Sequence, residues 1–151
     1  GAAAAACSEA EADPHELQRF LDAQAQYDTV LAELRDGQKR SHWMWYIFPQ
    51  LKGLGRSPAA WRYGVASLEE ARAYLRHPVL GDRLRECTRL VLAVQGRTAA
   101  EIFGWPDDVK LKSCMTLFAL AESGGGVFAE CLEKYFDGER DAATERALTS
   151  E

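Results

Sequence analysis

Three short segments of the chain carry the side chains best suited to chemistry. The first, residues 39–50, reads Lys-Arg-Ser-His-Trp-Met-Trp-Tyr-Ile-Phe-Pro-Gln and mixes aromatic with polar groups. If this segment is helical, His42 and Trp45 lie three residues apart on one face. Trp43 and Trp45 would wall a pocket that accepts a flat ring, and His42 and Gln50 would supply polar groups at its edge. The alternative is a central core helix, because exposing two tryptophans to water is unfavourable.

The second segment, residues 52–58, is a glycine-punctuated loop that reads Lys-Gly-Leu-Gly-Arg-Ser-Pro. Gly53 and Gly55 allow backbone N–H groups to approach an anion, and a helix that starts after the loop adds a favourable dipole. Lys52 and Arg56 would hold a phosphate group there. The loop matches neither a Walker A sequence nor a Rossmann fingerprint, because the final Gly-Lys-Ser/Thr and the third glycine are absent. A plain turn is the alternative.

The third segment, residues 107–116, is expected to begin a helix, where carboxylates are favoured by the helix dipole. Its polar side chains with a candidate role are Asp107, Asp108, Lys110, Ser113 and Thr116. Asp107 or Asp108 would act as an acid, a base or an acceptor for a ribose hydroxyl, and the others would contact or orient the substrate. The alternative is a solvated helix edge that Asp107 or Asp108 caps and on which Asp108 and Lys112 form an ion pair.

The spacing of the histidines and cysteines predicts neither a metal site nor a catalytic thiol. The three histidines and four cysteines show no metal-ligand pattern, so neither a metal nor another cofactor is predicted. Cys87, Cys114 and Cys131 align with apolar neighbours at helical spacing, which indicates small buried thiols in a reducing compartment.

The charge of the chain is acidic overall but unevenly distributed. Its 151 residues have a formal net charge of −5. Residues 35–62 hold six basic residues and one acidic residue, a local charge of +5, so the remainder sums to −10. The acidic total argues against a general nucleic-acid binder, and no apolar run approaches the ~18 residues of a membrane span. We therefore expect a soluble, cytoplasmic protein whose positive charge is localised.

Helices must position these segments. Helical periodicity extends from Asp13 to Gly37, and Ser67 and Thr98 each begin a capping-box sequence. His77-Pro78 is expected to end the helix that begins after Ser67, and residues 41–48 fit a short buried helix or a strand. The pattern predicts an all-α, compact single-domain bundle of about six to eight helices. The domain would span 13–137, after a disordered or artificially added stretch at 1–12 and before a polar tail at 138–151.

The motifs resemble domain-of-unknown-function family 1810, some members of which carry the label calpastatin-like. The matching stretches are residues 17–24, 39–55, 74–84 and 102–118, and the W-x-W-Y-x-F-P-Q run at 43–50 is specific. This resemblance implies a compact, mainly helical domain without an established reaction. The order of the helices and of the aromatic–glycine turn is also similar to the NADAR proteins, which are linked to ADP-ribose and NAD derivatives. The acidic helix near the start of NADAR proteins has no counterpart here.

Two hypotheses of function follow. In the first, the chain binds or processes a phosphorylated, ring-bearing metabolite such as a nucleotide, NAD or an ADP-ribose derivative. Asp107, Asp108 and His42 would then serve any catalysis, while the aromatic wall and the basic loop hold the ligand. In the second, a non-catalytic adaptor uses the same basic and aromatic groups to bind a protein or single-stranded nucleic acid. A pocket that unites Trp45, Arg56 and Asp108 would favour the first, and a flat patch the second. Neither hypothesis specifies an oligomeric state or decides whether the protein is an enzyme.

Overall fold

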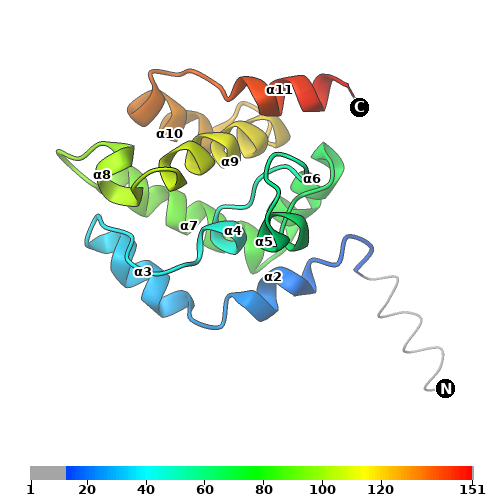
Figure 1. The fold of residues 1–151 in the computed structure, drawn as a ribbon, viewed down its shortest axis with the longest axis horizontal. Coiled ribbons are helices and arrows are strands. Elements are labelled where there is room, and N and C mark those ends of the chain that lie inside the picture. Colours follow the sequence, from blue (N-terminus) through cyan, green and yellow to red (C-terminus); the bar gives the residue numbers. More distant parts are fainter. Residues whose placement is uncertain (1–12, 151) are drawn as a thin grey trace.

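The protein is an all-α domain in a computed structural model that describes residues 13–150 (Figure 1). Its helices are α2 (Gln18–Ala23), α3 (Tyr27–Arg35), α4 (Met44–Ile47), α5 (Pro58–Arg62), α6 (Leu68–Arg76), α7 (Leu80–Ala93), α8 (Ala99–Phe103), α9 (Asp107–Ala121), α10 (Gly126–Phe136) and α11 (Ala142–Thr149). The ten helices between residues 13 and 150 exceed the expected six to eight because α2, α4, α5 and α8 have six residues or fewer. None of the helices in this range is both long and apolar enough to cross a membrane.

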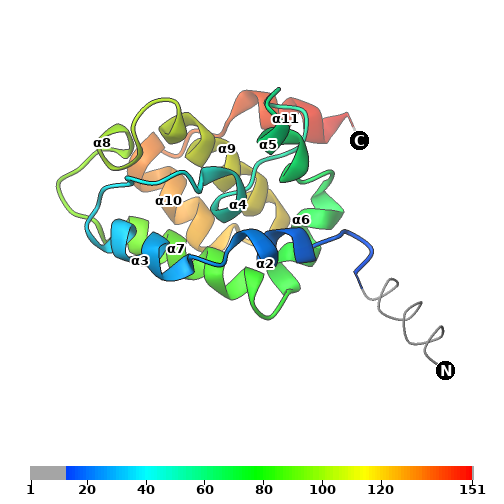
Figure 2. The ribbon, with the colours of Figure 1, turned by 60° about the horizontal axis from the view of Figure 1, so that its bottom comes forward.

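Helix α9 forms the centre of the bundle. It contacts α6, α8, α10 and α11, and most of its residues are buried, including Leu111, Cys114 and Phe118. A helix that is buried on nearly all sides must be covered by neighbours in every direction, which explains why several short helices surround it. Helix α4 lies near the middle of the molecule in both views, between the lower helices α2 and α3 and the upper helix α9 (Figure 1, Figure 2).

The helix boundaries show where local sequence signals decide the structure. The Ser67 hydroxyl accepts a hydrogen bond from the Glu70 N–H, and Thr98 and Glu101 form the full capping box, so both predicted helix starts are confirmed. Helix α6 ends before His77, as the following proline predicts. The predicted capping by Asp107 or Asp108 is wrong, because Pro106 occupies the N-cap position and neither carboxylate caps the helix.

The periodic stretch from Asp13 to Gly37 is two helices rather than one. Its break lies at residues 24–26, where Gln24 is 4% exposed. The Gln24 amide donates to the carbonyl oxygen of Tyr46 and accepts from Arg83, which are both distant in sequence. Tertiary hydrogen bonds therefore accompany a break that the apolar periodicity does not reveal.

The segment expected as a polar tail contains α11, which packs against α9. The buried hydroxyl of Thr116 donates to the carbonyl of Lys112 and accepts from the Asp141 N–H at 2.9 Å. Thr144, in the first turn of α11, is fully buried. A mostly polar segment can thus pack against the core through a few hydrogen bonds. Its sequence then shows little apolar periodicity from which the helix could be predicted.

Replacing Thr116 with Val is expected to release the beginning of α11. The substitution preserves shape but leaves the Asp141 N–H without its acceptor, so unfolding free energy should fall by about 1–2 kcal/mol. Amide exchange in residues 141–149 should accelerate more than exchange elsewhere. The control is Thr88→Val, because the buried Thr88 hydroxyl bonds only within its own helix, to Leu84. Equal exchange in both variants would contradict the role of Thr116.

Candidate functional site

A cleft of about 250 Å³ lies between α4, the loop after α4, and the beginnings of α9 and α11. Five residues that the sequence proposed for ligand binding line it: Trp45, Gln50, Gly55, Lys110 and Ser113. Leu54, Pro106 and Val109 add apolar walls. The cleft therefore combines an apolar lining with a small number of polar groups, which is the usual composition of a small-molecule site.

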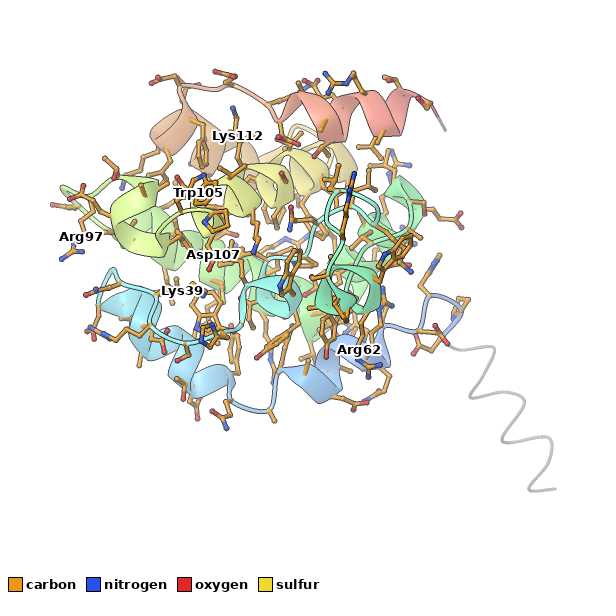
Figure 3. The ribbon with its side chains drawn as sticks, in the orientation of Figure 1. Lys39, Arg62, Arg97, Trp105, Asp107 and Lys112 are labelled. Carbon is orange, nitrogen blue, oxygen red and sulfur yellow. The ribbon has the colours of Figure 1, made fainter. Side chains whose placement is uncertain are left out.

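Lys110 connects the cleft to a cluster of charged groups at the start of α9. Its ammonium nitrogen lies 4.2 Å from the centroid of the Trp45 ring and 3.2 Å from Oδ1 of Asp107. The other oxygen of Asp107 lies 2.8 Å from the ammonium of Lys39, and the Lys39 side chain is only 7% exposed. Figure 3 shows Lys39 and Asp107 beside each other, with Arg62 well separated from them on α5. Two cations share one carboxylate, so these three groups sum to +1, and the Asp141 carboxylate on the cleft wall brings the sum to zero.

The carboxylate of Asp107 is a structural anion rather than a proton carrier. Burial alone would raise its pKa, but the hydrogen bonds from Lys39 and Lys110 outweigh burial and hold the pKa below its ordinary value. Asp107 is therefore ionised at neutral pH, and each of its oxygens is held by an ammonium group. This arrangement suits the positioning of Lys110 and opposes a role as a general base.

Gln50 is the polar residue of the cleft whose hydrogen bonds are incomplete. It is 8% exposed, and its backbone carbonyl accepts from the Val65 N–H at 2.8 Å. Its side-chain amide, with two donor hydrogens and one acceptor oxygen, makes no hydrogen bond to any residue between 13 and 150, and neither amide atom is fully buried. An amide that reaches the solvent of a cleft without a protein partner is a suitable contact for a polar ligand.

The comparisons with known proteins identify the family. The model of a family described as a protein of unknown function, DUF1810, matches residues 14–148. The chain belongs to the DUF1810 family. This DUF1810 chain is similar to the conserved hypothetical protein Rv1873 from Mycobacterium tuberculosis, with 57% sequence identity and a TM-score of 0.89. The match covers 91% of this chain and 99% of that crystallised chain. No curated protein matches the chain. The membership that the aromatic run at residues 43–50 implied is confirmed.

The two tryptophans of the aromatic run divide between core and cleft in this DUF1810 domain. Trp43 is 3% exposed, and its indole N–H donates to the buried carboxylate of Glu33 at 2.9 Å. Trp45 is half-buried and lines the cleft. A Cβ atom on Gly55 would lie 3.2 Å from the Trp45 ring and 2.9 Å from Ala60, so the glycine allows the ring to pack closely. Trp43 therefore fits the core interpretation, and Trp45 the ligand-wall interpretation.

The predicted phosphate loop of the DUF1810 domain lines the cleft with Leu54 and Gly55 but not with its basic residues. Lys52 is exposed and lies 6.0 Å from the centroid of the Trp61 ring. Gly53 is exposed with a φ of +98°, which the turn itself requires, and Arg56 is exposed. The cleft lining includes none of these three residues. Trp45 thus contacts Lys110, and the cleft includes neither Arg56 nor Asp108, so the pocket that would have favoured the metabolite hypothesis is not formed as predicted.

The remaining predicted residues have other surroundings. Oδ1 of Asp108 accepts from the neighbouring Val109 N–H, and Thr116 fastens α11. His42 is exposed and lines a separate cavity of about 310 Å³, together with Gln24 and Tyr46. None of the three candidate catalytic residues, Asp107, Asp108 and His42, lines the cleft, and of the three only His42 lines the separate cavity. The buried thiols also lack a nucleophilic form, because burial raises the pKa of Cys87 and Cys131 to about 12. Cys7 lies outside the described residues.

Two residues of the site were not assigned by sequence reasoning. Lys39 was counted among the basic residues, but its partner Asp107 is far away in the chain, so no local pattern marks the pair. Asp141 lines the cleft from the N-terminus of α11, in the segment expected as a tail. A cap signal was present, because an aspartate precedes residues with good helix propensity, but it indicates a helix and not a binding site.

Proposed function

We propose that the cleft binds a small metabolite that combines a flat ring with one anionic group, such as a phosphate. The observation that carries this proposal is the Gln50 side chain, which lines the cleft and whose amide has no hydrogen-bond partner within residues 13–150. Trp45 supplies an apolar wall of the same cleft, and Lys110 supplies a cation. A ring with polar edges would complete the hydrogen bonds of Gln50, and its anionic substituent would contact Lys110.

The size of the cleft limits the ligand. Its volume of about 250 Å³ lies below the range of about 300–1,000 Å³ typical of ligand pockets. It therefore accommodates one ring and a short substituent. A dinucleotide such as NAD, or an ADP-ribose derivative, would place its second half outside the cleft. The proposal is binding without an assigned reaction, because Asp107 is occupied by two ammonium groups.

Titration calorimetry with AMP, NAD and ADP-ribose tests the proposal. We expect AMP to bind, and we expect Gln50→Leu and Lys110→Met each to weaken binding about tenfold or more, because each removes a polar contact to the ligand. The matched control is Lys52→Met, which removes an equally basic residue outside the cleft and should leave the affinity unchanged. The absence of both heat and thermal stabilisation with all three compounds would overturn the proposal. Equal losses in Lys52→Met and Lys110→Met would place the site elsewhere.

A second candidate function is an adaptor surface on α5, supported by the exposure of Trp61. This side chain is 57% exposed and lies beside Lys52 and Arg62 in a shallow depression that Glu16 and Glu70 also line. Aromatic and cationic groups of this kind bind single-stranded nucleic acids or protein segments. For the nucleic-acid version, binding of a single-stranded oligonucleotide should fall steeply with salt and weaken in Trp61→Ala. Unchanged binding in that variant would remove the candidate.

A further inference from the structure

We infer that Asp141 accepts a hydrogen bond from a hydroxyl group of the ligand, and that the ligand is a ribonucleoside monophosphate. This inference rests on the proposed function of the cleft. Asp141 lines the cleft and is the N-cap residue of α11. Only one of its two carboxylate oxygens serves the cap, since Oδ2 accepts from both the N–H and the hydroxyl of Thr144, at 3.0 and 2.6 Å.

The second oxygen of Asp141 is available to a ligand. Oδ1 makes no hydrogen bond to any residue in the described range 13–150, and no Lys, Arg or His there forms an ion pair with Asp141. The backbone of Asp141 is held in place by the hydroxyl of Thr116 at 2.9 Å. The carboxylate is thus fixed at the cleft by two sets of contacts that leave one acceptor unused.

The polar groups of the cleft specify complementary groups on a ligand. Lys110 donates and attracts an anion, whereas the carboxylate of Asp141 repels an anion and requires a hydrogen-bond donor. Ser113 adds another acceptor, because its hydroxyl already donates to the carbonyl of Val109 at 3.3 Å. A ligand that fits must therefore carry both an anionic group and donors that lie apart from it.

A ribonucleoside monophosphate has this combination of groups, and because its base, sugar ring and phosphate together exceed one ring and a short substituent, part of it would extend beyond the cleft. Its base is a flat ring with polar edges for Gln50, its phosphate is the anion for Lys110, and its sugar connects the two through hydroxyl groups that can donate. Carboxylates bind ribose hydroxyls in the same way in nucleotide-binding folds. The sequence assigned this role to Asp107 or Asp108. In the structure Asp107 is held by two lysines and one oxygen of Asp108 is held by the Val109 N–H, whereas Asp141 lines the cleft.

The test compares AMP with its 2′,3′-dideoxy analogue, which lacks both sugar hydroxyls, by titration calorimetry. The wild-type protein should bind AMP about tenfold or more tightly than the analogue. In Asp141→Asn this preference should disappear. Asparagine is an equally good N-cap residue, so its oxygen can retain the bonds to Thr144 while the amide nitrogen at the cleft cannot accept. Asp82→Asn, an exposed change on α7, is the control and should keep the preference.

The outcomes separate this inference from the proposed function. Equal affinity of the wild-type protein for AMP and the analogue would overturn the role of Asp141 and leave ligand binding by the cleft intact. A preference that survives in Asp141→Asn would also overturn it. If neither compound binds, the inference fails, and the proposed function fails with it when NAD and ADP-ribose also give neither heat nor thermal stabilisation. Amide exchange across residues 142–149 should be unchanged in Asp141→Asn, and faster exchange would show that the substitution acts through α11 instead.

Discussion

Replacing Glu33 with Ala is expected to lower the free energy of unfolding by about 4 kcal/mol. The Glu33 side chain is buried and accepts hydrogen bonds from the backbone N–H groups of Arg40 and Ser41, at 2.7 and 2.9 Å. It also accepts from the Ser41 hydroxyl and the indole N–H of Trp43. Alanine would leave these four donors without their acceptor, and each unpaired buried donor costs about 1–3 kcal/mol before water enters. Urea unfolding of both proteins measures the difference.

The same carboxylate makes stability depend on pH in the acidic range. Burial alone would raise the pKa of Glu33, but the hydrogen bonds from Ser41, Arg40 and Trp43 outweigh it and lower the pKa to about 2. Because the folded-state pKa lies below the ordinary value of 4.5, the contribution is fully present above pH 4.5 and is lost as the pH falls through 2. In Glu33→Gln the hydrogen-bonding shape is largely kept, so stability at pH 7 should fall by only about 1–2 kcal/mol and this acid dependence should disappear.

The control for Glu33 is Glu130→Ala, which removes an exposed carboxylate from α10 and should change stability by less than about 0.5 kcal/mol. A loss in Glu33→Ala as small as that of the control would contradict the assigned role.

The loss of the Glu33 carboxylate should also affect the cleft, because Glu33 anchors residues 40–43, which lead into α4. If the segment moves, Trp45 moves with it, so Glu33→Ala should also weaken any ligand that Trp45 contacts.

Much of the fold could be predicted because local signals agree with the tertiary structure. Ser67, Thr98 and Pro78 mark helix ends through contacts within a few residues, and α7 and α10 show regular apolar spacing. The break at Gln24 was missed because its partners come from distant segments. Local sequence specifies a helix well when the residues that decide it are neighbours in the chain.

The candidate site could be predicted only in part, for the same reason. Trp45, Gln50 and Lys110 were named from their chemical types, and the fold brings all three to one cleft. The loop at residues 52–58 is predicted to hold a phosphate because its glycines open the backbone and Lys52 and Arg56 are basic. The short bridge between Leu51 and Val65 turns the chain at this point, and Lys52 instead lies beside Trp61. Lys110, from a distant segment, is therefore the lysine that lines the cleft, and Lys52 is not.

Replacing Asp107 with Ala is expected to destabilise the protein by about 3 kcal/mol, because it leaves the ammonium of Lys39 buried without its counterion. Lys39 keeps the Ser41 carbonyl at 2.6 Å and the Trp43 ring at 5.1 Å, which compensate only partly. Lys39→Met should have a smaller effect of about 1–2 kcal/mol, because Asp107 is more exposed and retains Lys110. The doubly substituted Lys39→Met/Asp107→Ala protein should lose about 1–2 kcal/mol less than the sum of the two single changes predicts, since removing both partners leaves no buried charge without its counterion.

This double-mutant cycle also distinguishes an anchor from a catalytic carboxylate. If Asp107 acts by holding Lys39 and Lys110, its contribution to stability should be present at neutral pH and should be lost on acidification, since its pKa lies below the ordinary value of 3.8. Removing Lys39 should raise that pKa and move the acid-induced loss to higher pH. Urea unfolding at several pH values measures both effects. An additive cycle with unchanged pH dependence would show that the ion pair contributes nothing to the folded state, and Asp107 would again be available for proton transfer. A coupled cycle with the shifted pH dependence instead identifies Asp107 as the structural counterion of Lys39.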